Sequence, residues 1–205
     1  MVKPTGTQKQ KTRSRPLRRR LNPAVRRAEL LDTALRVLRA KGPANVRVED
    51  ITRAAGAAKG TFYLYFASWN DLLIAVREHL LSTYASEVRA RFAAAAPSDQ
   101  WPAFENECVR FVDFIIELGD LHKAVFHGPI EDQPINETYS ADTLIAGLLS
   151  AWIATGVCRP VDVDAAAPLV FAVMHTTADG IALTGDREKR LESMLDLLRA
   201  WLRAP

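Results

Sequence analysis

The 205-residue chain is long enough for one large domain, or for a small domain joined to a larger one. Its apolar content of 48% is sufficient for a substantial core, so most of the chain should be folded. No apolar run approaches the roughly 18 residues needed to span a bilayer, and no secretory signal is evident. Cys108 and Cys158 lack metal-ligand spacing and are expected to be buried free thiols. These features favour a cytoplasmic protein without a membrane partner.

The net charge of +3 conceals a strong asymmetry along the chain. Residues 1–80 contain 17 Lys or Arg and 6 Asp or Glu, whereas residues 81–205 contain 10 and 18, so the two parts carry +11 and −8. A basic N-terminal end is typical of proteins with a polyanionic partner, and it favours nucleic acid here. Residues 1–20 hold no acid and almost no apolar side chain, which predicts a disordered basic arm. The charge alone leaves open a solubilising tail on an enzyme.

Helical signals dominate the rest of the chain. The pair Asn22–Pro23 predicts the start of the first helix, and Gly42 followed by Pro43 predicts its end. Residues 128–137 are expected to form a loop, and Pro168 predicts a late start or a kink in the helix that contains it. No strand pattern is present, so we expect an all-α protein of about nine helices. The others are predicted over residues 47–55, 58–66, 69–95, 101–119, 120–127, 140–156, 163–183 and 187–203.

The most informative stretch covers residues 46–73 and reads VRVEDITRAAGAAKGTFYLYFASWNDLL. A two-turn apolar face ends at Gly56, which permits a left-handed turn, and Phe62 and Phe66 then point inward from a second short helix. Two short helices joined by such a turn predict a helix-turn-helix over about residues 46–66. The second helix of this arrangement enters the major groove of DNA, so its outward residues are candidate DNA contacts. They are Lys59, Gly60, Thr61, Tyr63, Leu64 and Tyr65.

Residues 24–80 resemble the DNA-binding domain of the TetR (tetracycline-repressor-like) family. The series Gly-x-x-Lys-Gly-Thr-x-Tyr-x-Tyr-Phe from residue 56 to 66 carries the resemblance, with Asp71 and two leucines after it. The resemblance implies a three-helix DNA-binding domain over residues 21–68. It also implies a ligand-binding and dimerisation domain over residues 69–205. By position, Thr61 and Tyr63 match DNA contacts of the family, and Lys59 and Tyr65 match contacts with the DNA backbone.

Three positions depart from the family pattern. Arg47 stands where Ser or Thr usually caps the second helix, and Ala58 stands where Ser usually begins the recognition helix. Trp69 replaces a Lys that often meets phosphate. Arg47 can regain such a contact through its own charge, so Arg47 and Trp69 join the predicted DNA-binding residues. An unrelated helical hairpin is the alternative, but Tyr63 and Tyr65 alternate with the core aromatics and cannot share their face.

The C-terminal part combines apolar helices with a few polar groups, which is how small-molecule sites are built. Its aromatic residues are first of all core residues. We nevertheless expect part of them to line a cavity for an apolar or weakly polar effector. The predicted pocket residues are Trp101, Phe104, Cys108, Phe111, Phe126, Trp152, Met174, His175 and Thr176.

Histidines supply the remaining candidates for chemistry. His175 and Asp179 lie four residues apart and could ligate a metal, but a local hydrogen bond or a polar pocket lining is the commoner explanation. His122 and His127 are expected to cap a helix end or to face solvent. No glycine-rich phosphate loop, GxSxG or HExxH motif is present. We therefore predict no enzymatic activity, no metal and no cofactor.

The combined expectation is a homodimeric transcription regulator, with repression as its mode, that a small molecule releases from a palindromic operator. The last two helices should pair with their copies in a four-helix interface. The residues expected there are Leu191, Met194, Leu195, Leu198, Trp201 and Leu202. Two alternatives remain: an architectural DNA-binding protein indifferent to sequence, and a helical enzyme with an incidental basic arm.

Overall fold

The computed structural model describes residues 22–94, 96, 99–127 and 140–204. The predicted basic arm and the predicted loop at 128–137 lie outside these residues. Within the described ranges the protein has no strand, apart from an isolated bridge between Cys158 and Arg203, and the all-α prediction is confirmed. The described residues form nine α-helices and one 3-10 turn: α1 (Pro23–Lys41), η1 (Pro43–Asn45), α2 (Val48–Ala54), α3 (Lys59–Tyr63), α4 (Trp69–Ala94), α5 (Gln100–Leu118), α6 (Asp120–Phe126), α7 (Ala141–Ala154), α8 (Val163–Thr184) and α9 (Arg187–Leu202).

Local capping signals explain where the N-terminal helices begin and end. The side chain of Asn22 accepts a hydrogen bond from the backbone N–H of Ala24, and Gly42 ends α1 with a φ of 75°, as predicted. Helix α4 begins with a reciprocal pair, because Ser68 and Asp71 each accept the other's backbone N–H at 3.1 Å. The early part of the chain is thus defined by short-range interactions.

Helix α8 begins at Val163, the residue at which the sequence analysis placed its start. The carboxylate of Asp162 accepts the backbone N–H groups of Asp164 and Ala165, at 3.1 and 3.2 Å, and starts the helix at Val163. Pro168 lies inside the helix, so of the two predicted effects of this proline, a late start or a kink, the late start does not occur. The cap satisfies the first N–H groups, and a proline this close to the start removes only one backbone hydrogen bond.

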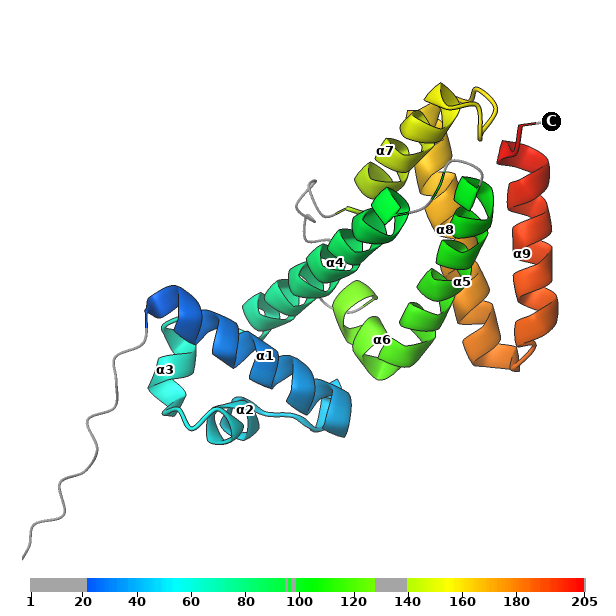
Figure 1. The fold of residues 1–205 in the computed structure, drawn as a ribbon. Coiled ribbons are helices and arrows are strands. Elements are labelled where there is room, and N and C mark those ends of the chain that lie inside the picture. The colour runs from blue at the N-terminus through cyan, green and yellow to red at the C-terminus, as the bar shows by residue number, and fades with distance from the viewer. Residues whose placement is uncertain (1–21, 95, 97–98, 128–139, 205) are drawn as a thin grey trace, which may run out of the picture.

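The helices bury two separate apolar cores. The N-terminal core is formed by α1, α2, α3, the first half of α4 and α6. The C-terminal core is formed by α5, α7, α8 and α9. Figure 1 shows α1, α2 and α3 at one end of the molecule and α7, α8 and α9 at the other, with α4 running between them. The N-terminal core therefore continues beyond residue 68, through Leu80 of α4 and on to Val125 of α6.

Helix α8 is long and apolar enough to cross a membrane, by length and composition alone, with a mean hydropathy of 1.3 over its most apolar window. It packs against α5, α7 and α9, which is the position of a core helix. As expected from the sequence, no uninterrupted apolar run reaches bilayer length. The mean hydropathy of α8 nevertheless reaches the level of a membrane-spanning helix, because the average tolerates a few polar residues. The buried residues of α8 are Ala166, Ala167, Val170, Met174, Ala178 and Ile181.

Candidate DNA-binding surface and ligand pocket

The turn between α2 and α3 sets the orientation of the short helix α3. Gly56 takes a φ of 57°, which favours glycine, and the backbone N–H of Ala57 donates to the carbonyl of Thr52 at 2.8 Å. Behind the turn, Phe62 and Phe66 are buried in the N-terminal core, as predicted. Two buried rings so close together fix the direction of α3, so its opposite face is held in one place.

That opposite face presents polar and aromatic groups to solvent. Tyr63 is 47% exposed and Leu64 is 80% exposed, and a Cβ added at Gly60 would meet no atom within 4 Å. Thr61 is half-buried beside them. A surface with hydroxyls, an aromatic ring and an open backbone position can approach both base edges and phosphates.

The other predicted contact residues, Arg47, Tyr65 and Trp69, differ in how far they are exposed to solvent. Arg47 is exposed at the start of α2 and makes no side-chain cap for that helix. Instead, the carboxylate of Asp50 accepts the backbone N–H of Arg47 at 3.0 Å and replaces half of the missing cap. Tyr65 and Trp69 are half-buried against the N-terminal core, so only part of each ring is available to a ligand.

Lys59 is ion-paired within the helix-turn-helix itself. Its Nζ lies 2.5 Å from Oε1 of Glu49, which joins the start of α3 to α2. The hydrogen bond to Glu49 raises the pKa of Lys59, and the same bond lowers the pKa of Glu49. A phosphate that approaches Lys59 therefore has to share it with a carboxylate. No sequence pattern predicts a role for Glu49, because the pair forms across the turn between α2 and α3.

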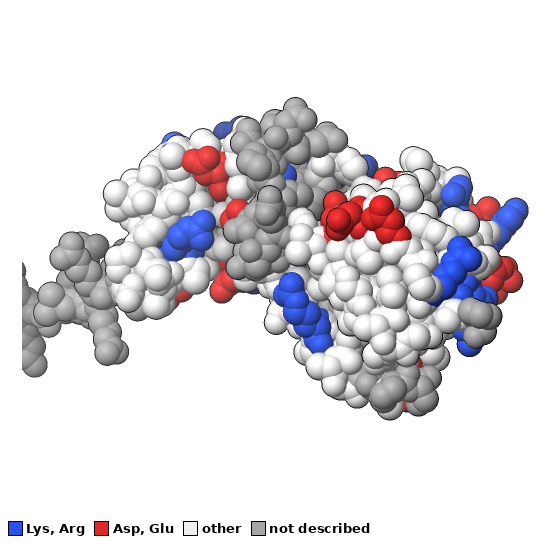
Figure 2. All heavy atoms as spheres, turned by 90° about the horizontal axis from the view of Figure 1, so that it is seen from above, with Lys and Arg blue, Asp and Glu red and all other residues white. Residues whose placement is uncertain are grey.

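Most of the net positive charge of the N-terminal part, +8 of +11, lies in residues 1–20, which hold eight of its 17 basic residues and no acid. Residues 22–80 hold the other nine, together with six acids. On the face shown in Figure 2, acidic and basic side chains are interspersed over a largely uncharged surface. The described part of the molecule thus offers shape and hydrogen-bonding groups on α3, while the strongest cationic segment precedes α1.

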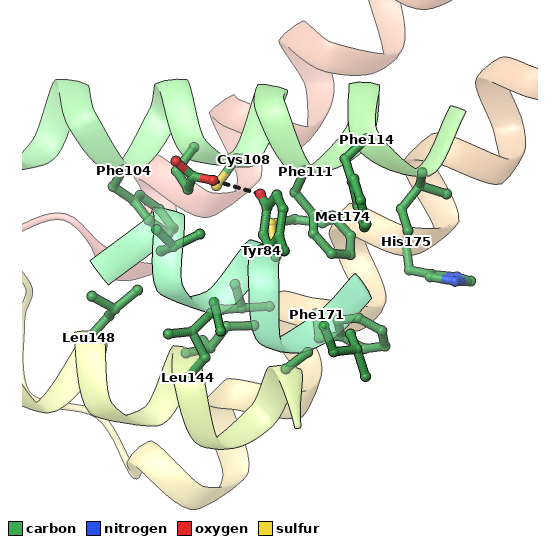
Figure 3. Close-up of a pocket in the computed structure, with 18 of the residues that line it drawn as sticks. Tyr84, Phe104, Cys108, Phe111, Phe114, Leu144, Leu148, Phe171, Met174 and His175 are labelled. Atoms are coloured by element: carbon green, nitrogen blue, oxygen red, sulfur yellow. Dashed lines mark hydrogen bonds between the residues drawn. The ribbon is translucent and has the colours of Figure 1, made fainter. Parts of the chain in front are cut away.

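An apolar cavity of about 70 Å³ lies between α4, α5, α7 and α8 (Figure 3). Five of its wall residues, Leu81, Tyr84, Ala85, Val88 and Phe92, come from α4 beyond the N-terminal core. Seven of the nine predicted pocket residues line it: Phe104, Cys108, Phe111, Phe126, Trp152, Met174 and His175. Trp101 is buried but is not among the residues that line the cavity, and Thr176 is on the exposed face of α8.

Glu107 is the charged residue among the described residues that line the cavity, and the sequence analysis did not identify it. Its carboxylate accepts from the hydroxyl of Tyr84 at 2.6 Å, the bond drawn as a dashed line at Tyr84 in Figure 3. It also accepts from Nε and Nη2 of Arg91, both at 2.8 Å. Burial, followed by the neighbouring Glu107 charge, raises the pKa of Tyr84 far above its ordinary value, so Tyr84 remains a neutral donor. The buried carboxylate is therefore satisfied by the protein itself.

Histidines meet at one end of this cavity. Nε2 of His175 lies 2.9 Å from Nε2 of His122, and Nδ1 of His175 lies 3.4 Å from the carboxylate of Asp179. His122 is only 4% exposed, so the prediction that it caps a helix end or faces solvent was wrong. Burial, reinforced by the other two histidines, lowers the pKa of His122 to about 4. His127 is exposed at the C-cap of α6, in agreement with the prediction.

Comparisons with known proteins agree with this architecture. The family profile described as "Bacterial regulatory proteins, tetR family" matches residues 30–76, which cover most of α1 to the first part of α4. The structure of a TetR-family transcriptional regulator from Pectobacterium atrosepticum superposes with a TM-score of 0.71 at 25% identity, over 89% of this chain and 95% of that one. The chain belongs to the TetR family. It is a transcriptional regulator with a DNA-binding helix-turn-helix, and this family consists of regulators and not of enzymes.

Two curated relatives show how the likeness is distributed along this TetR-family chain. The regulator YvdT of Bacillus subtilis is 40% identical over 63 residues, which are 31% of this chain and 32% of YvdT. CymR of Pseudomonas putida is 28% identical over 152 residues, or 72% of this chain and 73% of CymR. The higher identity is thus confined to a short match, which spans about a third of YvdT.

The predicted dimer residues of this TetR-family chain need a correction. Leu191, Met194, Leu198 and Leu202 are buried in the C-terminal core of the same chain, so they offer little surface to a partner, although Met194 also lines the groove between α8 and α9. Leu195 and Trp201 are half-buried and pack against that core. The exposed apolar residue of α9 is instead Leu197 at 52%, next to Leu169 of α8 at 54%. The inward and outward leucines of α9 are adjacent, so the sequence pattern did not separate them.

Proposed function

We propose that the protein is a cytoplasmic, ligand-responsive repressor that binds a palindromic operator as a homodimer. The carrying observation is the double role of α4. Its first half, from Leu72 to Leu80, packs in the N-terminal core that holds α3. Its second half, from Leu81 to Phe92, forms one wall of the apolar cavity. A movement forced on the second half is transmitted along a continuous helix to the DNA-binding surface.

The size of the cavity supports a response to ligand. Pockets that bind drug-sized molecules occupy roughly 300 Å³ or more, whereas this cavity measures about 70 Å³. A drug-sized ligand must therefore push the walls of this cavity apart, and α4 is one of these walls. Complete release from DNA requires roughly 5.5 kcal/mol of differential affinity between the two states, which two ligands per dimer can supply together. The walls select an apolar or weakly polar effector.

Dimerisation is proposed through the exposed faces of α8 and α9. A groove between them is lined by Leu169, Ala172, Val173, Thr176, Thr177, Asp186, Lys189, Arg190, Ser193, Met194 and Leu197. Exposed leucines beside charges of both signs suit an isologous interface, in which each patch meets its own copy. Two-fold symmetry would place the α3 helices in half-sites about 34–36 Å apart, which demands a palindromic operator.

The proposal is tested by fluorescence anisotropy of the full-length protein with its own upstream intergenic DNA, at near-physiological salt. Scrambled DNA serves as the competitor. We expect binding that survives the competitor and is released by an apolar compound from a screen. Binding that the competitor erases would favour a sequence-indifferent architectural protein. Absence of binding to either DNA would contradict the proposal.

A further inference from the structure

We propose that His122, His127 and His175 form a binding site for a divalent transition-metal ion, with zinc as the representative ion. His122 and His127 come from α6 and its C-cap, and His175 comes from the middle of α8. The potential ligand atoms of the three residues all lie within 4.8 Å of one another. Three neutral imidazoles with an open fourth position are a ligand set that zinc uses in proteins.

The distances place the cluster close to metal-binding geometry. Zinc–nitrogen bonds are about 2.0–2.1 Å long, so two nitrogens on a tetrahedral ion lie about 3.4 Å apart. Nε2 of His122 and Nε2 of His175 are 2.9 Å apart, so a small separation is enough to admit an ion between them. The ligand atom of His127 lies within 4.8 Å of the other two ligand atoms and has to come about 1.4 Å closer to reach the separation on a tetrahedral ion. As an exposed C-cap residue, His127 can do so without disturbing the core.

A second observation concerns the orientation of His175. The carboxylate of Asp179 lies one helical turn along α8, 3.4 Å from Nδ1 of His175. A carboxylate on one imidazole nitrogen fixes the ring and leaves the other nitrogen for the metal, which is the usual outer-shell arrangement of histidine ligands. The other nitrogen, Nε2, is hydrogen-bonded to Nε2 of His122, and an ion between the two atoms would replace this hydrogen bond. Figure 3 shows the ring of His175 turned away from Tyr84 and toward the end of the cavity.

The same rings could instead be an aromatic cluster without metal, in which the ring pairs are tilted or edge-to-face. Their centroids lie 4.8 to 5.1 Å apart, and Phe126 and Phe171 pack beside them. Without metal, a hydrogen bond between the two Nε2 atoms joins His122 to His175, and the carboxylate of Asp179 lies behind His175, so the cluster is also satisfied as a hydrogen-bonded set of rings. The two explanations differ in one observable, which is metal uptake.

The proposed metal site lies between α6 and α8, so metal binding can affect DNA binding. Leu121 and Val125 of α6 are buried in the N-terminal core, while His122 of the same helix reaches His175 of the C-terminal bundle. A metal held by both helices would join the DNA-binding end to the helix that also lines the cavity. Metal occupancy would then change the affinity for DNA. Metal uptake itself is measured without DNA, so it stands independently of the function proposed above.

The experiment is calorimetric titration of zinc chloride into full-length protein that has been treated with EDTA and dialysed. We expect one zinc ion per chain, and at least a hundredfold weaker binding in His127→Ala and His175→Ala. Asp179→Asn should weaken binding about 10- to 100-fold, as outer-shell changes do. The fourth histidine, His79, lies in the first half of α4, and His79→Ala is the matched control that should bind like the wild type.

Thermal unfolding separates metal binding from loss of fold. His127 is exposed, so His127→Ala should keep the wild-type melting temperature without metal and lose the increase that zinc produces. Failure of the wild type to take up zinc would overturn the proposal in favour of the aromatic cluster. Equal zinc affinity in wild type and His127→Ala would overturn it as well, and so would loss of binding in His79→Ala.

Discussion

The DNA-binding surface and the ligand cavity differ in what lies behind them. Behind α3, the rings of Phe62 and Phe66 fill the core completely, so the exposed Tyr63 is held on a rigid support. The cavity, by contrast, is surrounded by long aromatic and aliphatic side chains around unfilled space. Recognition of a DNA sequence needs fixed groups, whereas response to a ligand needs walls that can move. Helix α4 belongs to both regions and connects the two requirements.

The largest expected effect tests the rigid side of this comparison. Tyr63→Ala should lower operator affinity by about a hundredfold or more, because each base contact contributes about 1–3 kcal/mol and is lost in both half-sites. The melting temperature should stay unchanged, since the side chain is half exposed. Anisotropy titration measures the affinity. Val25→Ala, at a residue of equal exposure on α1, is the control. Retained operator affinity in Tyr63→Ala would remove Tyr63 from the DNA-binding surface.

The second effect tests the surface on α8 and α9 that is proposed as the dimer interface. Leu197→Glu should raise the dimer dissociation constant by about a hundredfold, because the charge enters a two-fold interface twice. Sedimentation velocity would then show monomers with an unchanged melting temperature. Leu195→Glu should lower the melting temperature in addition, since Leu195 packs against the C-terminal core. A dimer that survives Leu197→Glu would place the interface away from this groove.

The contrast between Leu195 and Leu197 shows where sequence reasoning reached its limit. Signals that act within four residues, such as Asn22–Pro23, Gly42 and the series from Gly56 to Phe66, predicted α1 and the helix-turn-helix correctly. A stripe of leucines on α9 predicts an apolar face but not which partner covers it. His122 and His175 meet across 53 residues, and the fold alone brings them together. Glu107 was missed for the same reason, since its partners lie on α4.

The third effect concerns the polar group inside the apolar wall. Tyr84→Phe should lower the free energy of unfolding by about 1.5–3 kcal/mol, because it removes a hydrogen bond to a buried carboxylate. Chemical denaturation measures the change, and Tyr65→Phe in the turn after α3 should change it by less than about 0.5 kcal/mol. Equal effects of the two changes would mean that Glu107 is satisfied without Tyr84.

The smallest effect returns to the rigid region and to two of the three positions that depart from the family pattern. Arg47 and Ala58 occupy the N-cap positions of α2 and α3 in extended backbone conformations, and neither supplies a side-chain cap. Serine at either position should accept a backbone N–H and raise the free energy of unfolding by about 0.5–1 kcal/mol. Arg47→Ser and Ala58→Ser should therefore stabilise the protein to a similar extent.

The two cap variants should differ on DNA. Arg47→Ser removes a cation, so the slope of log affinity against log salt should fall by about 1 for each phosphate contact that is lost. Ala58→Ser removes no charge and should leave the slope unchanged. Anisotropy titrations over a range of salt concentrations measure both slopes. Identical slopes would show that Arg47 does not contact phosphate. A lower slope in Arg47→Ser alone would mean that arginine at this position gives up helix stability in return for a phosphate contact. The rigid region would then be adapted to DNA binding at one exposed side chain, at a cost in its own stability.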